Sequence, residues 1–160
     1  MRKLSFSVLL LSLISFQIAL ADSFPKGPNE QITPGALCTA PTAHRYPEQI
    51  AYCDRNVDSM TKDAVIAEYD RRFGYNIEHM QRGQFKIDHY IPLCMGGANS
   101  ADNLWPQHSS VYNITDPLEP LLCEKMSEGK LLQKDAVEMI KEAKNHLELV
   151  PEIMRKAQSL

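Results

Sequence analysis

The sequence predicts a small α+β fold, in which a mostly helical single domain contains two short strands and begins with an extended arm. Alternating apolar and polar residues near the middle of the chain indicate the strands, over residues 84–93 and 103–105. Apolar stripes at helical spacing precede and follow them, at 61–73, 118–126 and 134–149. A length of 160 residues favours one domain.

The first 21 residues have the pattern of a secretory signal peptide. Arg2 and Lys3 form a positive start, residues 4–20 are apolar with a few Ser and Gln interruptions, and residues 19–21 (Ala-Leu-Ala) form a cleavage site. A transmembrane anchor is the alternative, but an anchor needs about 20 strongly apolar residues. We therefore predict a mature domain over residues 22–160 that is exported to the periplasm or outside the cell, with no membrane contact after cleavage.

The net charge argues against binding of nucleic acid by overall attraction. The chain has 17 Lys and Arg against 20 Asp and Glu, and loss of Arg2 and Lys3 leaves 15 against 20, a net charge of −5. Non-specific affinity for nucleic acid comes mainly from basic side chains that contact phosphates. Any contact with DNA or RNA therefore has to be local, and a bound metal ion can supply part of the positive charge. The composition makes no prediction about the oligomeric state.

Four cysteines in an exported chain predict two disulfide bonds. Four cysteines allow three pairings. Cys38 and Cys53 lie close in sequence on either side of a Pro-containing loop, which favours this pair and leaves Cys94 with Cys123. A structural zinc site is the alternative, but the sequence contains no C-x-x-C pair.

The first part of the mature chain, residues 22–48, is predicted to be an extended arm that a bridged Cys38 would tie down. Residues that interrupt regular structure recur along it: Pro25, Gly27, Pro28, Pro34, Gly35, Pro41 and Pro47. We expect His44, Arg45 and Tyr46 to belong to a solvated loop.

A helix is predicted over residues 61–73, where the apolar stripe consists of Val65, Ile66, Tyr69 and Phe73. Ser59 or Thr61 can cap its start, and Gly74 follows its end. Two more helices are predicted over 118–126 and 134–149. Gly129 is expected to end the first of them, and Pro151 the second. A short turn is predicted to complete the chain.

The first strand is predicted over residues 84–93, and Pro92 ends its alternation of apolar and polar residues. The segment 95–99 that follows is predicted to be a loop, because its two glycines permit a positive φ. A second, shorter extended piece over 103–105 is expected to stop at Pro106.

Asp88, His89 and Asn103 suit the hydrolysis of a phosphodiester. The reaction needs a group that deprotonates water near neutral pH, for which an imidazole with a pKa near ~6.5 is suited. Neighbouring side chains of an extended chain point to opposite sides, so Asp88 can hold a metal while His89 faces the attacking water. Asn103 can return across the loop and fix the orientation of the imidazole by a hydrogen bond.

The segment FKIDHYIPLCMGGANSADNLWPQH, residues 85–108, resembles the HNH nucleases of the ββα-metal fold. It is closest to a bacterial exported group with a D-H-x-I-P-L-x-x-G-G-x-N…N-L-W-P core, and residues 46–62 and the C-terminal helices resemble that group more loosely. The resemblance implies a ββα-metal core over about 84–127 and a metal-dependent endonuclease. It also implies a divalent ion, Mg²⁺ before Mn²⁺, Ni²⁺ or Zn²⁺, and a nucleic-acid substrate, DNA before RNA.

By the same resemblance, Asp88 is the first metal ligand, His89 is the general base and Asn103 positions His89. The family's third motif residue is a His or Asn about nine residues after the middle Asn, but Tyr112 stands there in this sequence. The second metal ligand therefore stays open among three residues, namely His108, Asn113 and Asp116.

Two other classes of function stay open. The departure at Tyr112 and the acidic net charge are compatible with a catalytically inactive HNH-like domain that binds a partner or a metal. A secreted factor that is stabilised by disulfides or zinc, without nucleic-acid chemistry, is the third hypothesis.

Overall fold

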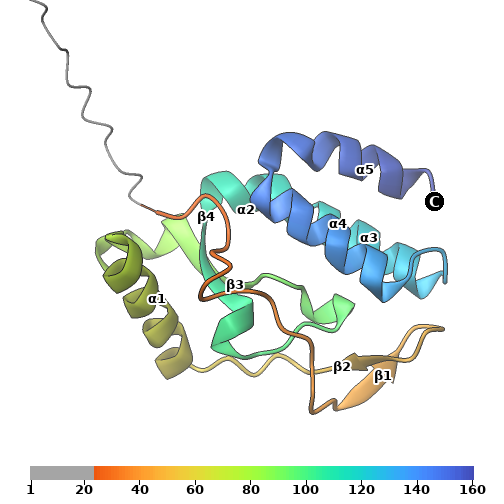
Figure 1. Cartoon of the computed structure of the whole chain (residues 1–160), viewed down its shortest axis with the longest axis horizontal. Coiled ribbons are helices and arrows are strands. Elements are labelled where there is room, and N and C mark those ends of the chain that lie inside the picture. The colour runs from red at the N-terminus through yellow and green to blue at the C-terminus, as the bar shows by residue number, and fades with distance from the viewer. Residues whose placement is uncertain (1–23) are drawn as a thin grey trace, which may run out of the picture.

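The fold is a mixture of helices and small antiparallel sheets, as the sequence predicts. The structure is a computed structural model that describes residues 24–160, so the predicted signal peptide lies outside the described residues. Along the chain (Figure 1) the elements are β1 (Ala43–Arg45), β2 (Ile50–Tyr52), α1 (Ser59–Phe73), β3 (Phe85–His89), β4 (Leu104–His108), α2 (Ser109–Thr115), α3 (Leu118–Ser127), α4 (Gln133–Asn145) and α5 (Val150–Gln158).

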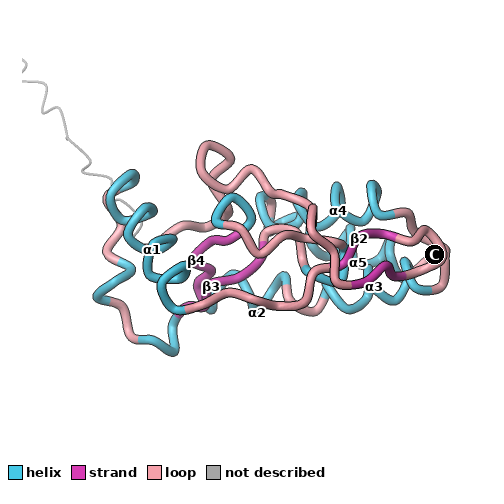
Figure 2. The backbone as a smooth tube through the Cα atoms, turned by 90° about the horizontal axis from the view of Figure 1, so that it is seen from below, coloured by secondary structure: helices cyan, strands magenta, loops and turns pink. Residues whose placement is uncertain are grey.

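The β3–β4 hairpin occupies the centre of the molecule. Its strands pair antiparallel from Phe85 opposite His108 to His89 opposite Leu104, and α2 follows β4 directly. Figure 1 shows the hairpin between α1 on one side and the helices α3, α4 and α5 on the other, and Figure 2 gives the same order from below. The side chains of β3 and β4 therefore lie between two helical layers.

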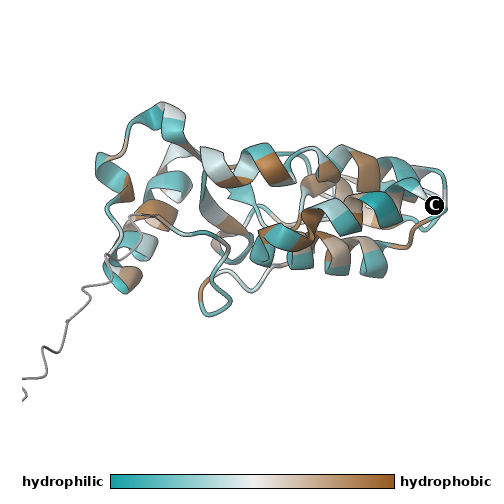
Figure 3. Cartoon of the chain, turned by 90° about the horizontal axis from the view of Figure 1, so that it is seen from above, coloured by the Kyte–Doolittle hydropathy of each residue, from teal (hydrophilic) through white to brown (hydrophobic). Residues whose placement is uncertain are grey.

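Two apolar clusters hold these layers together. One joins α1 to the hairpin through buried residues that include Val65, Tyr69 and Trp105. The other packs α3, α4 and α5 on each other, on Ile50 and on the loop after β3. Figure 3 shows apolar and polar residues alternating around these C-terminal helices, as expected when one face of each helix is buried. Within residues 24–160, no helix combines the length and the apolar character that a membrane crossing requires.

The prediction for the C-terminal end of α1 is confirmed, and the prediction for its N-terminal cap is wrong. Gly74 takes a positive φ of 71° just past the helix, as predicted for a residue that ends it. The predicted caps Ser59 and Thr61 were wrong, because the side chain of Asp58 accepts the hydrogen bond from Thr61 N at 2.7 Å. A carboxylate there also faces the positive end of the helix dipole.

Three extended or helical segments differ from prediction at or near prolines. Pro106 does not stop the second strand but pairs with Ile87 inside β4, which is tolerated because β3 is the only strand that β4 pairs with in residues 24–160. Residues 43–45, predicted to be solvated loop, form the exposed strand β1 paired with β2. The helix predicted over 134–149 ends at Asn145, and the predicted final turn is instead the helix α5, with Pro151 in its first turn, where its missing N–H costs nothing.

Both predicted disulfides are present, and they involve all four cysteines. Cys38–Cys53 ties the N-terminal arm to the end of β2, and Cys94–Cys123 ties the loop after β3 to α3. The second bridge closes the longer loop, with a sequence separation of 29 residues against 15. Two disulfides agree with an exported protein.

Replacement of both Cys94 and Cys123 by Ala is expected to lower the free energy of unfolding by about 3–4 kcal/mol, because the bridge restricts the unfolded chain. Urea unfolding of the variant and of the intact protein, followed by circular dichroism, measures the difference. The Cys38→Ala/Cys53→Ala protein is the matched control and should lose slightly less, since its loop is shorter. An unchanged midpoint in the first variant would contradict the expected contribution.

Candidate metal centre and active site

Asp88 and His89 are neighbours in β3, and their side chains have separate surroundings. The carboxylate of Asp88 lies near groups of α2, α3 and α4, whereas the ring of His89 contacts Arg55 and Asn99 from two loops. Alternation along a strand produces this division. It agrees with the expectation that the two side chains point to opposite sides.

Three carboxylates form a cluster on the Asp88 side. One oxygen from each of Asp88, Asp116 and Glu119 lies within 4.8 Å of the other two. Asp88 comes from β3, Asp116 is the residue at which α2 ends, and Glu119 lies in the first turn of α3. The tight turn between α2 and α3 therefore brings two acids against the strand.

Each of these acids also keeps one buried oxygen without a hydrogen-bond partner among the described residues, namely Asp88 Oδ2, Asp116 Oδ1 and Glu119 Oε1. Buried carboxylate oxygens are costly when they are left without a donor or a cation. Asp88 Oδ2 and Glu119 Oε1 lie within ion-pair distance of a lysine, whereas Asp116 Oδ1 has no such contact among the described residues, so a positive ion would stabilise it most.

Two lysines already supply part of this positive charge. Lys86 Nζ lies 2.7 Å from Asp116 Oδ2 and 3.5 Å from Asp88 Oδ2. Lys144, whose side chain is fully buried, places Nζ 2.7 Å from Glu119 Oε1, outside hydrogen-bond geometry, and 3.6 Å from Asp88 Oδ2. Three carboxylates and two ammonium groups leave one negative charge in excess when all five are ionised.

Burial and the lysines set the protonation of the acids. Burial alone would raise the pKa of Asp88, but the ammonium groups of Lys144 and Lys86 outweigh it and hold that pKa below its ordinary value. Burial raises the pKa of Glu119 despite the attraction of Lys144, and the negative charge of Asp88 adds to the increase. Asp88 is thus held in its charged form more firmly than Glu119.

The donor set of the cluster fits a hard divalent cation. Mg²⁺ prefers oxygen ligands at about 2.0–2.1 Å, so ligands on opposite sides of the ion are roughly 4.2 Å apart. At most one pair among three ligands can lie on opposite sides, and adjacent ligands of an octahedral Mg²⁺ are roughly 3 Å apart. Oxygens within 4.8 Å of one another would therefore have to move closer together to bind it. Each of the three carboxylates offers one oxygen as a ligand atom for such an ion.

The ring of His89 is held on both nitrogens. Arg55 NH1 lies 3.3 Å from Nδ1, and Asn99 Oδ1 lies 3.1 Å from Nε2. A guanidinium can only donate, so Nδ1 accepts and Nε2 carries the proton that is donated to Asn99. The ring therefore fits the neutral form, with its lone pair on Nδ1 directed at Arg55.

Burial lowers the pKa of His89, and the charge of Arg55 lowers it further, against the opposing effect of the hydrogen bond that His89 donates to Asn99. A neutral imidazole is the form that can accept a proton from water. Arg55 itself is an exposed residue between β2 and α1, and its second amino group donates to Ile87 O at 3.3 Å. Because the guanidinium of Arg55 lies at Nδ1 of His89, its position controls the access of water to the Nδ1 lone pair.

Asn103 has a loop-closing role in the structure. Its Oδ1 accepts from Ile91 N at 2.9 Å, and its Nδ2 donates to Ile91 O and Ala98 O at 3.0 and 2.9 Å. These bonds use both amide protons of Asn103. The prediction that Asn103 holds the His89 ring is therefore wrong, and Asn99 makes that contact. Gly97 completes the loop, because a Cβ there would overlap the carbonyl oxygen of Ile91.

Replacement of Asn103 by Ala is expected to lower the free energy of unfolding by roughly 3 kcal/mol or more, because the three backbone groups lose buried hydrogen bonds. Thermal unfolding monitored by circular dichroism measures the loss. Asn113→Ala, on the exposed face of α2, is the matched control and should stay within about 0.5 kcal/mol of the original protein. Equal stability of the two variants would contradict the loop-closing role.

The candidate ligands His108 and Asn113 are placed differently from Asp116. His108 ends β4, and its Nδ1 accepts a hydrogen bond from Ser110 N at 3.1 Å as the cap of α2. Its ring stacks on Phe24 with the centroids 3.7 Å apart. Asn113 is exposed on α2. Of the three candidates, Asp116 is the one that the fold brings to Asp88.

Glu119, Arg55 and Lys144 were not predicted from the sequence as site residues. A partial signal exists for one of the acids, because Asp116 follows Tyr112 by four residues and so lies one helical turn further on the same face. Glu119 follows Asp116 by three residues but belongs to the next helix, α3, so this spacing does not extend to it. Arg55 and Lys144 have no local signal, since they reach His89 from 34 and 55 residues away.

Comparison of the chain with protein-family models, with curated proteins and with solved structures gives no match.

Proposed function

We propose that this protein is an exported, metal-dependent nuclease of the HNH type that hydrolyses phosphodiester bonds. The observation that carries the proposal is the division at β3. One side chain, Asp88, joins a cluster of three carboxylates, and the ring of its neighbour His89 is held between Asn99 and an exposed arginine. The order of β3, loop, β4 and α2 is that of the ββα-metal core that the motif suggests.

Asp88, Asp116 and Glu119 are the residues that would hold the divalent ion. When bound, such an ion stabilises negative charge on the phosphate and on the leaving oxygen. Asp116 replaces His108 and Asn113 as the proposed second ligand, because the fold brings its carboxylate to Asp88. Lys144 anchors the strand at this point by donating to the carbonyl oxygen of His89 at 2.6 Å.

His89 is the proposed general base, and Nδ1 is the atom that takes the proton from water. Asn99 holds the opposite nitrogen and thereby fixes the tautomer. Arg55 occupies the lone pair of Nδ1 in this structure. A substrate phosphate that pairs with the guanidinium would draw Arg55 aside and open Nδ1 to water, since arginine suits bidentate binding of phosphate.

Digestion assays test the proposal. Plasmid DNA, single-stranded DNA and RNA are incubated with the purified mature domain in Mg²⁺, Mn²⁺, Ni²⁺ or Zn²⁺, and in EDTA. We expect cleavage of at least one substrate that stops in EDTA and returns when the metal is added back. Full activity in EDTA would contradict a metal-dependent mechanism.

A second candidate is a catalytically inactive HNH-like domain. The contacts of Lys86 and Lys144 with the acids favour it, because these lysines can act as the cations of a purely structural ion-pair network. Absence of cleavage with every metal, together with absence of Mn²⁺ binding in calorimetry, would favour this candidate over the nuclease.

A further inference from the structure

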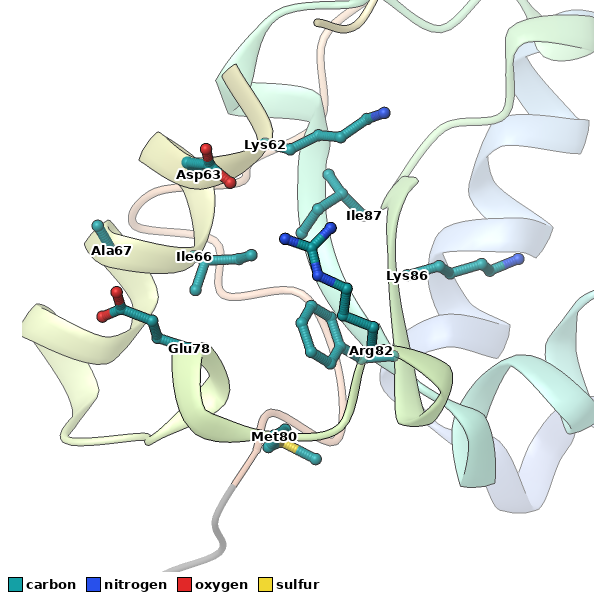
Figure 4. A pocket seen from close by; sticks show the side chains of 10 residues that line it. Lys62, Asp63, Ile66, Ala67, Glu78, Met80, Arg82, Lys86 and Ile87 are labelled. Carbon is teal, nitrogen blue, oxygen red and sulfur yellow. The ribbon is translucent and has the colours of Figure 1, made fainter. Parts of the chain in front are cut away.

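A pocket with a volume of about 660 Å³ lies between α1 and β3, on the opposite side of the strand from the carboxylate cluster. Figure 4 shows apolar side chains inside it and charged groups around it, whereas the Lys86 side chain points away toward the C-terminal helices. The apolar lining is formed by Ile66, Ala67, Met80, Phe85 and Ile87, and the charged groups are Lys62, Asp63, Glu78 and Arg82.

The pocket lies on the face of β3 that also carries His89. Phe85, Ile87 and His89 alternate with Lys86 and Asp88, so the first three share one side of the strand. A strand rises about 3.3 Å per residue, which places Ile87 roughly 7 Å and Phe85 roughly 13 Å along the strand from His89. A chain whose phosphate is at His89 can therefore extend a neighbouring group into the pocket.

The chemistry of the pocket suits a nucleobase. Phe85 is half-buried and offers an aromatic surface beside Ile66 and Ile87, and base stacking on aromatic side chains does not require a particular sequence. Asp63 and Glu78 are exposed at the edge, where carboxylates can accept hydrogen bonds from exocyclic amino groups.

Arg82 adds a cation at the mouth of the pocket. Its side chain is exposed, and it forms no ion pair with any residue in the range 24–160. Figure 4 shows its guanidinium directed over the pocket, near Ile87. A free guanidinium beside an apolar cavity is suited to the phosphate that precedes or follows a bound base.

We propose that this pocket binds an unpaired nucleobase next to the scissile phosphate, so that the protein prefers single-stranded over double-stranded nucleic acid. The inference rests on the proposed nuclease function and names its substrate class. A base within a duplex is stacked and paired, and its extrusion into a pocket costs free energy that an already single-stranded base does not require.

Binding without turnover tests the inference. Fluorescein-labelled 12-mers of single-stranded DNA and RNA, and the corresponding DNA duplex, are titrated with the protein in EDTA, and fluorescence anisotropy gives the Kd. We expect the better single strand to bind about tenfold or more tightly than the duplex. Equal affinity, or no measurable binding of either single strand, overturns the proposal.

Two variants locate the binding to the pocket. Arg82→Ala and Phe85→Leu should each weaken single-strand binding about fivefold or more, whereas Arg155→Ala, at an exposed arginine of α5, should not. Circular dichroism confirms that the variants are folded. Unchanged affinity in both pocket variants overturns the inference even if the protein cleaves nucleic acid. Single-strand binding that depends on the pocket, without cleavage in any of Mg²⁺, Mn²⁺, Ni²⁺ and Zn²⁺, would instead overturn the nuclease proposal alone.

Discussion

Replacement of His89 by Ala is expected to reduce the rate of phosphodiester cleavage by about 10²–10⁴-fold, because the attacking water loses its general base. The imidazole is neutral in its present surroundings, and burial and Arg55 both lower its pKa. Initial rates on the substrate that the digestion assays identify measure the effect, at saturating metal and at neutral pH.

The ring of His89 is buried, so the fold of the variant has to be checked by circular dichroism and thermal unfolding. His89→Gln provides a second variant that keeps a polar side chain for Arg55 and Asn99 and should be about equally inactive. His44→Ala, at an exposed histidine of β1, is the matched control and should retain full activity. Near-normal rates in both His89 variants would contradict the assignment of His89 as the general base.

Replacement of Asp88 or Asp116 by Asn is the second large expected effect. Either change removes the single excess negative charge of the cluster, since two carboxylates would then face two lysines. We expect Mn²⁺ affinity, measured by calorimetry, to fall by at least about 100-fold and cleavage at a fixed Mg²⁺ concentration to fall by about 10²-fold or more.

Asn has nearly the shape of Asp, so the packing around Lys144 should survive. Asp135→Asn, at an exposed acid of α4, is the control and should leave both quantities unchanged. Higher Mg²⁺ should partly restore cleavage by the cluster variants, because the loss is one of metal affinity. Normal metal affinity in Asp88→Asn would falsify the assignment of this carboxylate as a ligand.

The parts of the site that the sequence predicted depend on local geometry. Asp88 and His89 were expected on opposite sides because an extended strand alternates, and they have the separate surroundings that this predicts. The Cys38–Cys53 bridge could be predicted because its residues are close in sequence, and the other bridge followed from it. The composition and these patterns were also sufficient to predict the α+β class.

The remaining parts depend on contacts between distant segments. Lys144 comes from α4 and Arg55 from the loop before α1, and no local pattern links either residue to His89. Asn99, not Asn103, contacts the His89 ring, because the amide of Asn103 is used in hydrogen bonds to the backbone of Ile91 and Ala98. The prediction that Pro106 ends the second strand was wrong, because a proline is tolerated inside β4 only if β4 has no second neighbouring strand, and local sequence does not show this.

The most direct test of the central claim is a crystal structure of the protein soaked in Mn²⁺, with anomalous diffraction data. We predict one strong anomalous peak in contact with oxygens of Asp88, Asp116 and Glu119, and no such peak in Asp88→Asn crystals treated in the same way. A cluster that stays closed around Lys86 and Lys144 without a peak, or a peak bound only elsewhere on the protein, would contradict the account.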